Sequence, residues 1–362
     1  MRRISILLLT LFTLAVSAAW PQAREQWWHR GCVPGQPEPE FSVPQGQDTE
    51  TVAVADNGDV FTVDLYSGTV YRIDTKGKAT TIATLFPAGK YPSLQAVGLL
   101  LGHDDSIYVL ANTWDPATHG VWQVYLDGRV RLDAPIPIQG LLNGQPTLGF
   151  LNAQVFDRQG NRYVTDSTLG AIWKVSRDGT VQLWVQSDLL IWATDPTGPF
   201  GATGIAYRDG TLYVVNLDAG AGVLPNVRGS SYPVVSVPIE RDGSAGTIQV
   251  SVVGDIKAPD GIAFDRDGYM YVVDFGGLPA WEALAWAFPY AGPSRLLRFD
   301  PDGTNETVIA EAGLCNSSKV AVRGQTAYVT NLYVTGVDPF GFAGCLPEVV
   351  PKIVKVDLCA NH

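Results

Sequence analysis

The feature that most constrains this chain is a strand–turn–strand unit that occurs six times. Its clearest copy is residues 259–274, PDGIAFDRDGYMYVVD, in which apolar residues alternate on both sides of a Gly-containing turn. Such alternation around a tight turn predicts a β-hairpin. The residues that open the six units, 47 to 58 positions apart, are Glu50, Val97, Asn152, Thr203, Asp260 and Ser318. A period of about 40–60 residues with several strands in each unit predicts an all-β fold, a six-bladed β-propeller with four-stranded blades.

The repeats divide the chain into three parts. Residues 1–19 have a charged start, an apolar run and a small-residue cleavage site, which predicts a secretory signal peptide. Residues 20–47 predict a lead-in, in which the alternating stretch 41–43 could close the last blade from the other end of the chain. Residues 48–362 predict the propeller. We therefore expect a secreted, extracellular protein.

The four cysteines fit this compartment. They are Cys32, Cys315, Cys345 and Cys359. In an oxidising environment four cysteines predict two disulfides, for which three pairings are open. We prefer Cys315–Cys345 with Cys32–Cys359, because these bonds would hold the ring closed. A metal site at these cysteines is not favoured, since no histidine lies at ligand spacing from any of them.

Charge narrows the range of partners. The formal net charge is −11 and no cluster of Lys and Arg is present, which argues against nucleic acid and anionic membranes as partners. After the signal segment no stretch is long enough to span a bilayer. We expect a monomer that binds a small molecule. Two sequons, at Asn305 and Asn316, predict N-glycosylation in a eukaryotic secretory route.

The lengths of the connections between predicted strands indicate which end of the propeller carries the functional site. The turns after the first and third strands of each repeat are short, whereas the variable segments follow the second strands or lie between blades. In antiparallel blades those two kinds of variable connection lie at the same end. Loops on a rigid scaffold are where function usually lies. This is also the end at which each inner strand begins, so the six opening residues should point into the centre there.

That predicted ring of residues is polar. Glu50 and Asp260 supply carboxylates, Asn152 an amide, and Thr203 and Ser318 hydroxyls, while no Lys, Arg or His stands at an equivalent position. Buried carboxylates are costly unless they are paired or coordinated. A Ca²⁺ ion would satisfy these oxygens. The alternative is that both carboxylates accept hydrogen bonds from backbone or water.

Aromatic residues mark the same end of the predicted propeller. Those in variable segments are Trp114, Trp192, Trp281 and Trp286. Because a polar surface loop has no need of such side chains, they predict a wall or lid for an apolar substrate, with Thr203 and Ser318 beneath it. By contrast, Trp122, Trp173 and Trp184 lie in or beside strands and are expected to fill gaps between blades.

The repeats resemble the senescence marker protein/gluconolactonase family of six-bladed propellers, related in fold to paraoxonase-type lactonases and strictosidine synthase. The resemblance covers about residues 48–358, and the 259–274 motif is its most specific part. It implies one divalent cation, usually Ca²⁺, at the centre. It also implies Glu50, Asn152 and Asp260 as metal ligands and catalytic residues. This chain departs from the family at the fourth blade, where Thr203 replaces an Asn ligand.

Three functions remain open from the sequence. The first is a hydrolase that uses Ca²⁺ to polarise the carbonyl of an apolar lactone or ester, with Asp260 or Glu50 activating water and Asn152 orienting the substrate. The second is a non-hydrolytic cyclase of secondary metabolism, of the hetero-Diels–Alder kind that similar secreted fungal propellers catalyse. It would hold two reacting groups together in an apolar pocket. The third is a binding propeller without catalysis. A serine-type nucleophile is not supported, because the chain has no Gly-x-Ser-x-Gly elbow.

Overall fold

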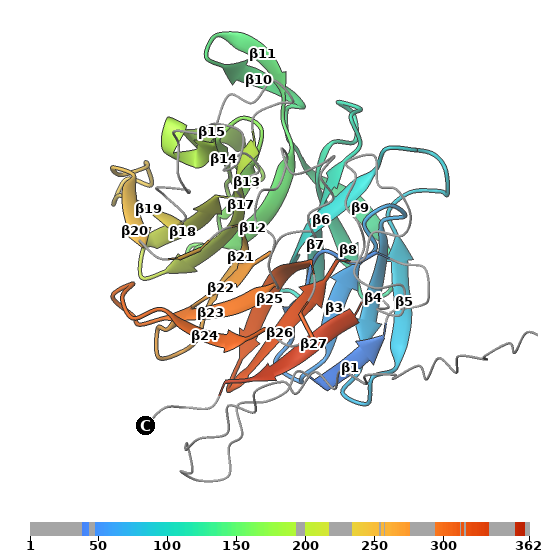
Figure 1. The fold of residues 1–362 in the computed structure, drawn as a ribbon. Helices are drawn as coiled ribbons and strands as arrows, with labels where there is room; N and C mark the ends of the chain where they lie inside the picture. The colour runs from blue at the N-terminus through green and yellow to red at the C-terminus, as the bar shows by residue number, and fades with distance from the viewer. Residues whose placement is uncertain are drawn as a thin grey trace, which may run out of the picture. The chain divides into compact units, whose positions relative to one another are not determined.

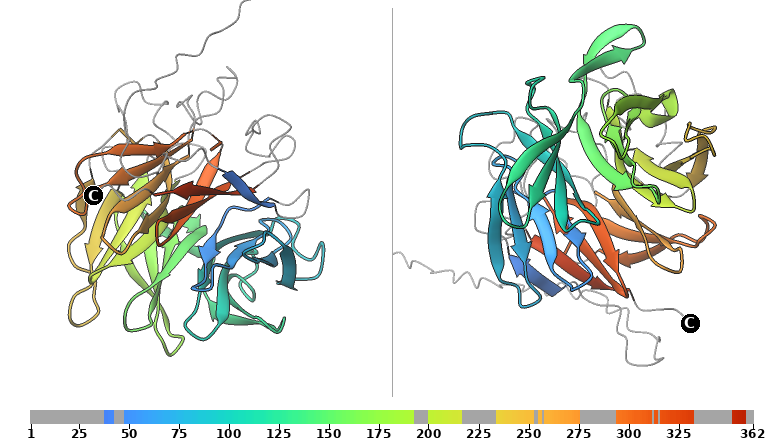
Figure 2. Two further views of the ribbon diagram at one scale, coloured as in Figure 1. Left: turned by 90° about the horizontal axis from the view of Figure 1, so that it is seen from below. Right: turned by 180° about the vertical axis from the view of Figure 1, so that it is seen from behind.

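The computed structural model of the protein describes residues 38–42, 48–192, 200–216, 234–252, 255–256, 258–275, 294–311, 313–314, 316–332 and 352–358. These residues form six antiparallel blades, five of four strands and one of five, and one separate two-stranded hairpin. Figures 1 and 2 show the six sheets arranged around a common centre. The predicted six-bladed β-propeller is confirmed.

The first three blades follow the predicted repeats in order. Blade 1 contains β2 (Ala53–Val54), β3 (Val60–Val63), β4 (Thr69–Ile73) and β5 (Ala79–Thr84). Blade 2 contains β6 (Gln95–Leu101), β7 (Ser106–Asn112), β8 (Gly120–Tyr125) and β9 (Val130–Pro135). Blade 3 contains β12 (Leu151–Phe156), β13 (Arg162–Asp166), β14 (Ala171–Val175) and β15 (Val181–Gln186).

The last three blades differ at their edges. A 3-10 helix, η1 (Asp188–Leu190), leads into blade 4, which contains β16 (Ile191–Trp192), β17 (Phe200–Arg208), β18 (Thr211–Asn216), β19 (Val234–Pro238) and β20 (Gln249–Val252). Blade 5 contains β21 (Pro259–Phe264), β22 (Met270–Asp274), β23 (Arg295–Phe299) and β24 (Thr307–Ala310). Blade 6 contains β25 (Ser317–Arg323), β26 (Thr326–Asn331), β27 (Lys352–Asp357) and β1 (Glu38–Ser42).

The strand β1 comes from residues that precede the first blade, and it lies at the outer edge of the last one. It pairs antiparallel with β27, so that Phe41 lies opposite Ile353 and Ser42 opposite Lys352. Disulfide closure of the ring stays a prediction, because all four cysteines lie outside the described residues.

Among the described residues the core consists of six apolar clusters, one between each pair of neighbouring blades. Side chains of blades 1 and 2 form the first cluster, and the series continues round to a sixth cluster in which Val52 and Val60 of blade 1 pack with Tyr328 and Ile353 of blade 6. The inner strands contact one another in the same cyclic order, with β2 touching both β6 and β25. This arrangement explains why the middle strands of a blade are apolar on both faces, since each blade is covered on either side by another.

The variable segment between blades 2 and 3 contains a hairpin that the sequence analysis did not predict. It consists of β10 (Gln139–Leu142) and β11 (Gln145–Leu148), joined by Asn143-Gly144 with φ of 51° and 76°. Figures 1 and 2 show this hairpin projecting from the blades. No helix among the described residues is long and apolar enough to cross a membrane.

Candidate functional site

The repeat-opening residues lie where the inner strands lose their regular register. In blades 2 to 6 the pairing of the inner strand with the second strand shifts its register at the opening residue. Along the inner strands of blades 2, 3, 4, 5 and 6 in turn, the shift lies between Val97 and Leu100, Leu151 and Gln154, Ala202 and Ile205, Pro259 and Gly261, and Ser317 and Val320. A bulge interrupts the alternation of side chains and redirects the residues within it. Blades 2 to 6 therefore orient their opening residues by the same local irregularity.

Three of these residues come together around one cation, the ammonium of Lys319. Its Nζ donates a hydrogen bond to Asn152 Oδ1 at 2.9 Å and another to Asp260 Oδ1. Glu50 Oε1 lies 3.4 Å from the same nitrogen, which makes an ion pair, and the Asp260 backbone oxygen also lies at 3.4 Å. The convergence expected of Glu50, Asn152 and Asp260 is thus present, and its centre is a lysine of blade 6.

The sequence analysis missed Lys319 because of the bulge. Lys319 directly follows the opening residue Ser318, so regular alternation would turn it to the other face of the strand. The register shift between Ser317 and Val320 leaves both Ser318 and Lys319 out of the ladder. Ser318 Oγ donates to Asp260 Oδ2, while Lys319 reaches the same carboxylate through its Oδ1. No Lys, Arg or His opens a repeat, but the register shift brings the lysine that follows an opening residue to the ring.

The cluster is removed from water. The side chains of Lys319, Glu50 and Asp260 are 10%, 11% and 7% exposed. Burial raises the pKa of the Glu50 carboxyl to about 7, and the Asp260 carboxylate adds to the rise, whereas the Lys319 ammonium opposes it. Glu50 therefore changes its charge near neutral pH, which suits a general acid or base.

The residues do not fit a divalent cation as they stand. The three oxygens that would ligate the metal face the Lys319 ammonium, and an ion with two charges about 4 Å from it would be repelled by on the order of 8 kcal/mol at an effective dielectric constant of about 20. Thr203, the position at which the sequence resemblance implied an amide ligand, directs its hydroxyl to the backbone oxygens of Val215 at 3.3 Å and Pro259 at 3.4 Å. Among the described residues no group of three His, Cys, Asp or Glu side chains is placed to hold a metal.

The Asp or Asn that ends each second strand is structural. All six are buried: Asp64, Asn112, Asp166, Asn216, Asp274 and Asn331. Asp166 accepts hydrogen bonds from the backbone of Phe150 at 2.9 Å and from the Trp173 indole at 3.1 Å, and burial raises its pKa. Asn112 reaches across to the backbone of Leu151 in the next blade. These side chains fix the segments that lead into the inner strands.

Of the four predicted substrate-contacting tryptophans, the structure describes the side chain of Trp114 alone. It is partly buried, has a φ of 61°, and donates from Nε1 to the Ser93 oxygen at 3.2 Å. Its ring lies beside His119 and Phe150, at 6.1 and 6.4 Å between centroids. Trp281, Trp286 and the side chain of Trp192 lie outside the described residues, so the aromatic wall stays a prediction.

The tryptophans assigned to packing do pack. Trp173 belongs to the cluster between blades 2 and 3. Trp122 meets Phe86 edge to face at 4.8 Å, and Trp184 meets Tyr163 in the same way at 4.8 Å.

His119 is an unexpected feature of the blade-2 loop. It is fully buried, and neither ring nitrogen has a hydrogen-bond partner in the described part of the structure. Burial lowers the pKa of His119 to about 4, so the imidazole is neutral at physiological pH.

The two sequons differ in their surroundings. Asn305 is exposed and donates from Nδ2 to Asp300 at 2.7 Å. The Asn316 amide is buried, and its nitrogen has no hydrogen-bond partner among the described residues. A glycan requires an accessible amide, so Asn305 is the better placed of the two. Glycosylation at either position stays a prediction.

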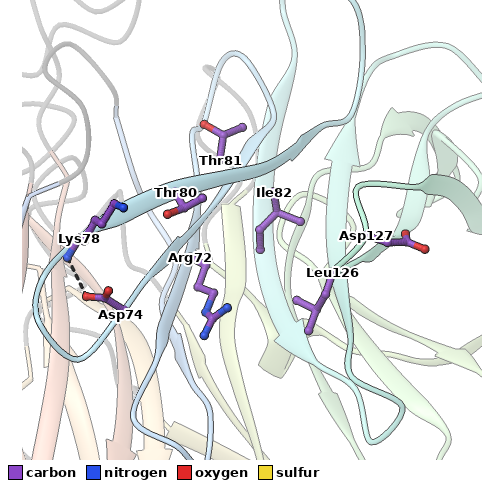
Figure 3. A pocket seen from close by; sticks show the side chains of 8 residues that line it. All are labelled: Arg72, Asp74, Lys78, Thr80, Thr81, Ile82, Leu126 and Asp127. Atoms are coloured by element: carbon purple, nitrogen blue, oxygen red, sulfur yellow. Dashed lines mark hydrogen bonds between the residues drawn. The ribbon is translucent and has the colours of Figure 1, made fainter.

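A separate groove of about 350 Å³ lies between the outer parts of blades 1 and 2 (Figure 3). Its lining is Arg72, Asp74, Lys78, Thr80, Thr81, Ile82, Leu126 and Asp127. Opposite charges alternate around it, and Arg72 is already paired with Asp59. None of the repeat-opening residues contributes to this groove.

The fold is shared with enzymes and with a calcium-binding protein. A gluconolactonase from Xanthomonas campestris matches with a TM-score of 0.56 and 15% identity, covering 88% of this chain and 88% of that chain. Regucalcin, a calcium-binding protein from Agrobacterium tumefaciens, matches with a TM-score of 0.56 and 14% identity over 86% and 92%. A virginiamycin B lyase from Staphylococcus aureus matches with a TM-score of 0.50 and 14% identity over 87% and 83%.

No protein-family model matches the sequence, and no curated protein is significantly similar to it. At identities near 14% the structural likeness establishes the fold alone. At that level, the expected resemblance to gluconolactonase-type propellers is confirmed.

Proposed function

We propose that this protein is a secreted enzyme that hydrolyses a lactone or ester of an apolar small molecule at the Lys319 cluster. The observation that carries the proposal is the convergence of side chains from blades 1, 3 and 5 on one buried ammonium, that of Lys319 in blade 6. Acidic and basic groups placed together with a carboxyl pKa near 7 are typical of catalytic sites. The gluconolactonase of the same fold supports the reaction class.

The geometry distinguishes the two carboxylates. Asp260 accepts hydrogen bonds from both Lys319 and Ser318, so it is held firmly and orients the ammonium. Glu50 is bound more loosely, at 3.4 Å from Nζ, and its pKa near 7 leaves it able to take a proton. Between the two candidates for the base we therefore favour Glu50.

The proposed reaction proceeds in two steps. Glu50 takes a proton from a water molecule as that water attacks the carbonyl carbon, and the carbonyl oxygen, now negative, is stabilised by the Lys319 ammonium in the place that Glu50 vacates. The tetrahedral intermediate then breaks its bond to the alcohol oxygen, which takes the proton back from Glu50. Asn152 would orient the substrate beside Nζ. The products are a carboxylic acid and an alcohol, joined in one molecule when the substrate is a lactone.

A Ca²⁺-assisted form of this hydrolysis is the competing version. Regucalcin, of the same fold, is a calcium-binding protein. In this chain Ca²⁺ would have to displace Lys319 from Asn152 and Asp260.

A non-hydrolytic cyclase is the second candidate. The Thr203 hydroxyl, turned to backbone oxygens, and a cluster whose charges pair internally both suit a site that holds an apolar substrate without a metal. The virginiamycin B lyase is a non-hydrolytic relative in fold.

The test is turnover of a panel of aromatic and long-chain lactones and esters by the purified protein, followed by proton release. We expect hydrolysis by the wild type, loss of at least about 100-fold in Glu50→Gln, and unchanged rates in Glu311→Gln, the same chemical change at an exposed carboxyl. A folded protein that hydrolyses nothing on the panel would refute the proposal. Cyclisation of hydrophobic intermediates would then be the next assay.

A further inference from the structure

The position of Lys319 has a consequence for the chemistry of the whole site. We propose that the Lys319 ammonium is a built-in cation that takes the place of a divalent metal at the centre of this propeller. The inference rests on the proposed function, because it names the positive charge that such a reaction uses.

The contacts of the ammonium are those of a cation in an oxygen cage. Nζ meets three side-chain oxygens from three different blades: Asn152 Oδ1, Asp260 Oδ1 and Glu50 Oε1. The Asp260 backbone oxygen lies at 3.4 Å from Nζ as well, so four oxygens surround the three protons of the ammonium and its donor capacity is fully used. The cage is complete without any further ion.

The space at the centre of the propeller allows one long side chain such as that of Lys319. In blades 2 to 5 the residue after the opening position is small: Gly98, Ala153, Gly204 and Gly261. A Cβ at Gly204 would lie 2.4 Å from the Asp260 backbone oxygen, and one at Gly261 would lie 2.6 Å from that of Ser318. The inner strands of neighbouring blades therefore approach too closely for a long side chain at the position after the opening residue. Among blades 2 to 6, only blade 6 carries one, Lys319.

The backbone around Lys319 holds it in this position. The Thr330 hydroxyl accepts a hydrogen bond from the Lys319 amide at 2.9 Å and donates to the Glu50 backbone oxygen at 2.8 Å. The lysine and one of its acceptors are thus tied to the same side chain. A cation fixed covalently in this way is neither lost to chelators nor exchanged for another ion.

The proposal is tested by metal content and thermal unfolding of the intact protein. We expect the wild type to contain far less than one Ca²⁺ per chain and to keep its Tm in EDTA and in about 1 mM CaCl₂. Lys319→Ala gives the position the small residue of the other blades and leaves two carboxylates and an amide facing one another. This variant should unfold at a lower Tm in EDTA and recover several degrees with CaCl₂.

The control is Lys76→Ala, an exposed lysine in a turn, which should match the wild type in every condition. A wild type that holds about one Ca²⁺ per chain and loses Tm in EDTA overturns the proposal, even if Lys319→Ala does not fold. A folded Lys319→Ala that ignores Ca²⁺ overturns it as well. Because these measurements use no substrate, a metal-free protein without hydrolase activity refutes the proposed function and leaves this inference standing.

Discussion

Replacing Glu50 by Gln should stabilise the protein at alkaline pH while abolishing hydrolysis. Gln keeps the shape of the side chain and removes the charge that burial disfavours. In the folded state burial raises the pKa of Glu50 from 4.5 to about 7, against the opposing attraction of the Lys319 ammonium. The unfolded chain ionises this carboxyl near 4.5 and the folded chain only near 7, so the wild type loses free energy of unfolding as the pH rises between these values.

The size of that loss follows from the shift. Each pKa unit corresponds to about 1.4 kcal/mol, so ionised Glu50 lowers the free energy of unfolding by on the order of 3 kcal/mol above pH 7. Urea unfolding of wild type and Glu50→Gln from pH 4 to 9 measures it. The two proteins should agree near pH 4 and diverge up to about pH 7, with Glu50→Gln the more stable, while Glu311→Gln follows the wild type throughout.

A difference that does not change with pH would refute the assignment of a raised pKa. A Glu50→Gln protein that is less stable than the wild type at pH 8 would also refute the role of Glu50 as the base. It would mean that the ion pair with Lys319 outweighs the desolvation of Glu50, and that this carboxylate is an anchor instead of a base.

Two further substitutions test the surroundings of the site. The folded pKa of His119 is lowered to about 4, so the wild type loses stability as the pH falls from about 6.5 towards 4, and His119→Leu should remove this loss, measured as the change in Tm between pH 7 and pH 5. A His119→Leu protein with the acid sensitivity of the wild type would contradict this. Gly204→Ala places a Cβ 2.4 Å from the Asp260 oxygen and should cost roughly 1–3 kcal/mol in urea unfolding and lower activity as Asp260 shifts, whereas a neutral effect on both would show that the two strands can separate.

The blades could be predicted from the sequence because each repeat carries its own turn and alternation. The six opening residues, the short turns and the buried Asp or Asn at each second strand all reflect local rules, and the structure confirms the six blades. The hairpin β10–β11 was missed although its signal was present. Asn143-Gly144 between strand residues favours a two-residue turn with positive φ, which the two residues adopt.

The centre of the site could be predicted in part. Counting residues from one repeat to the next placed Glu50, Asn152 and Asp260 together, since that counting needs only the period. Lys319 escaped because side-chain direction at a bulge does not follow alternation. The sequence does contain one relevant sign: blades 2 to 5 have Gly or Ala after the opening residue, and blade 6 has Lys.

The site also lies across the seam where the first and last blades meet. Glu50 begins blade 1 and Lys319 belongs to blade 6, and Thr330 links their backbones by hydrogen bonds of 2.8 and 2.9 Å. If these two blades separated, the ammonium would lose Glu50 and the carboxylate would lose the charge that offsets its burial. The cluster is therefore complete only when blades 1 and 6 are in contact. A ring opened at this point would retain four well-formed interior blades and still lack the arrangement on which the proposed chemistry depends.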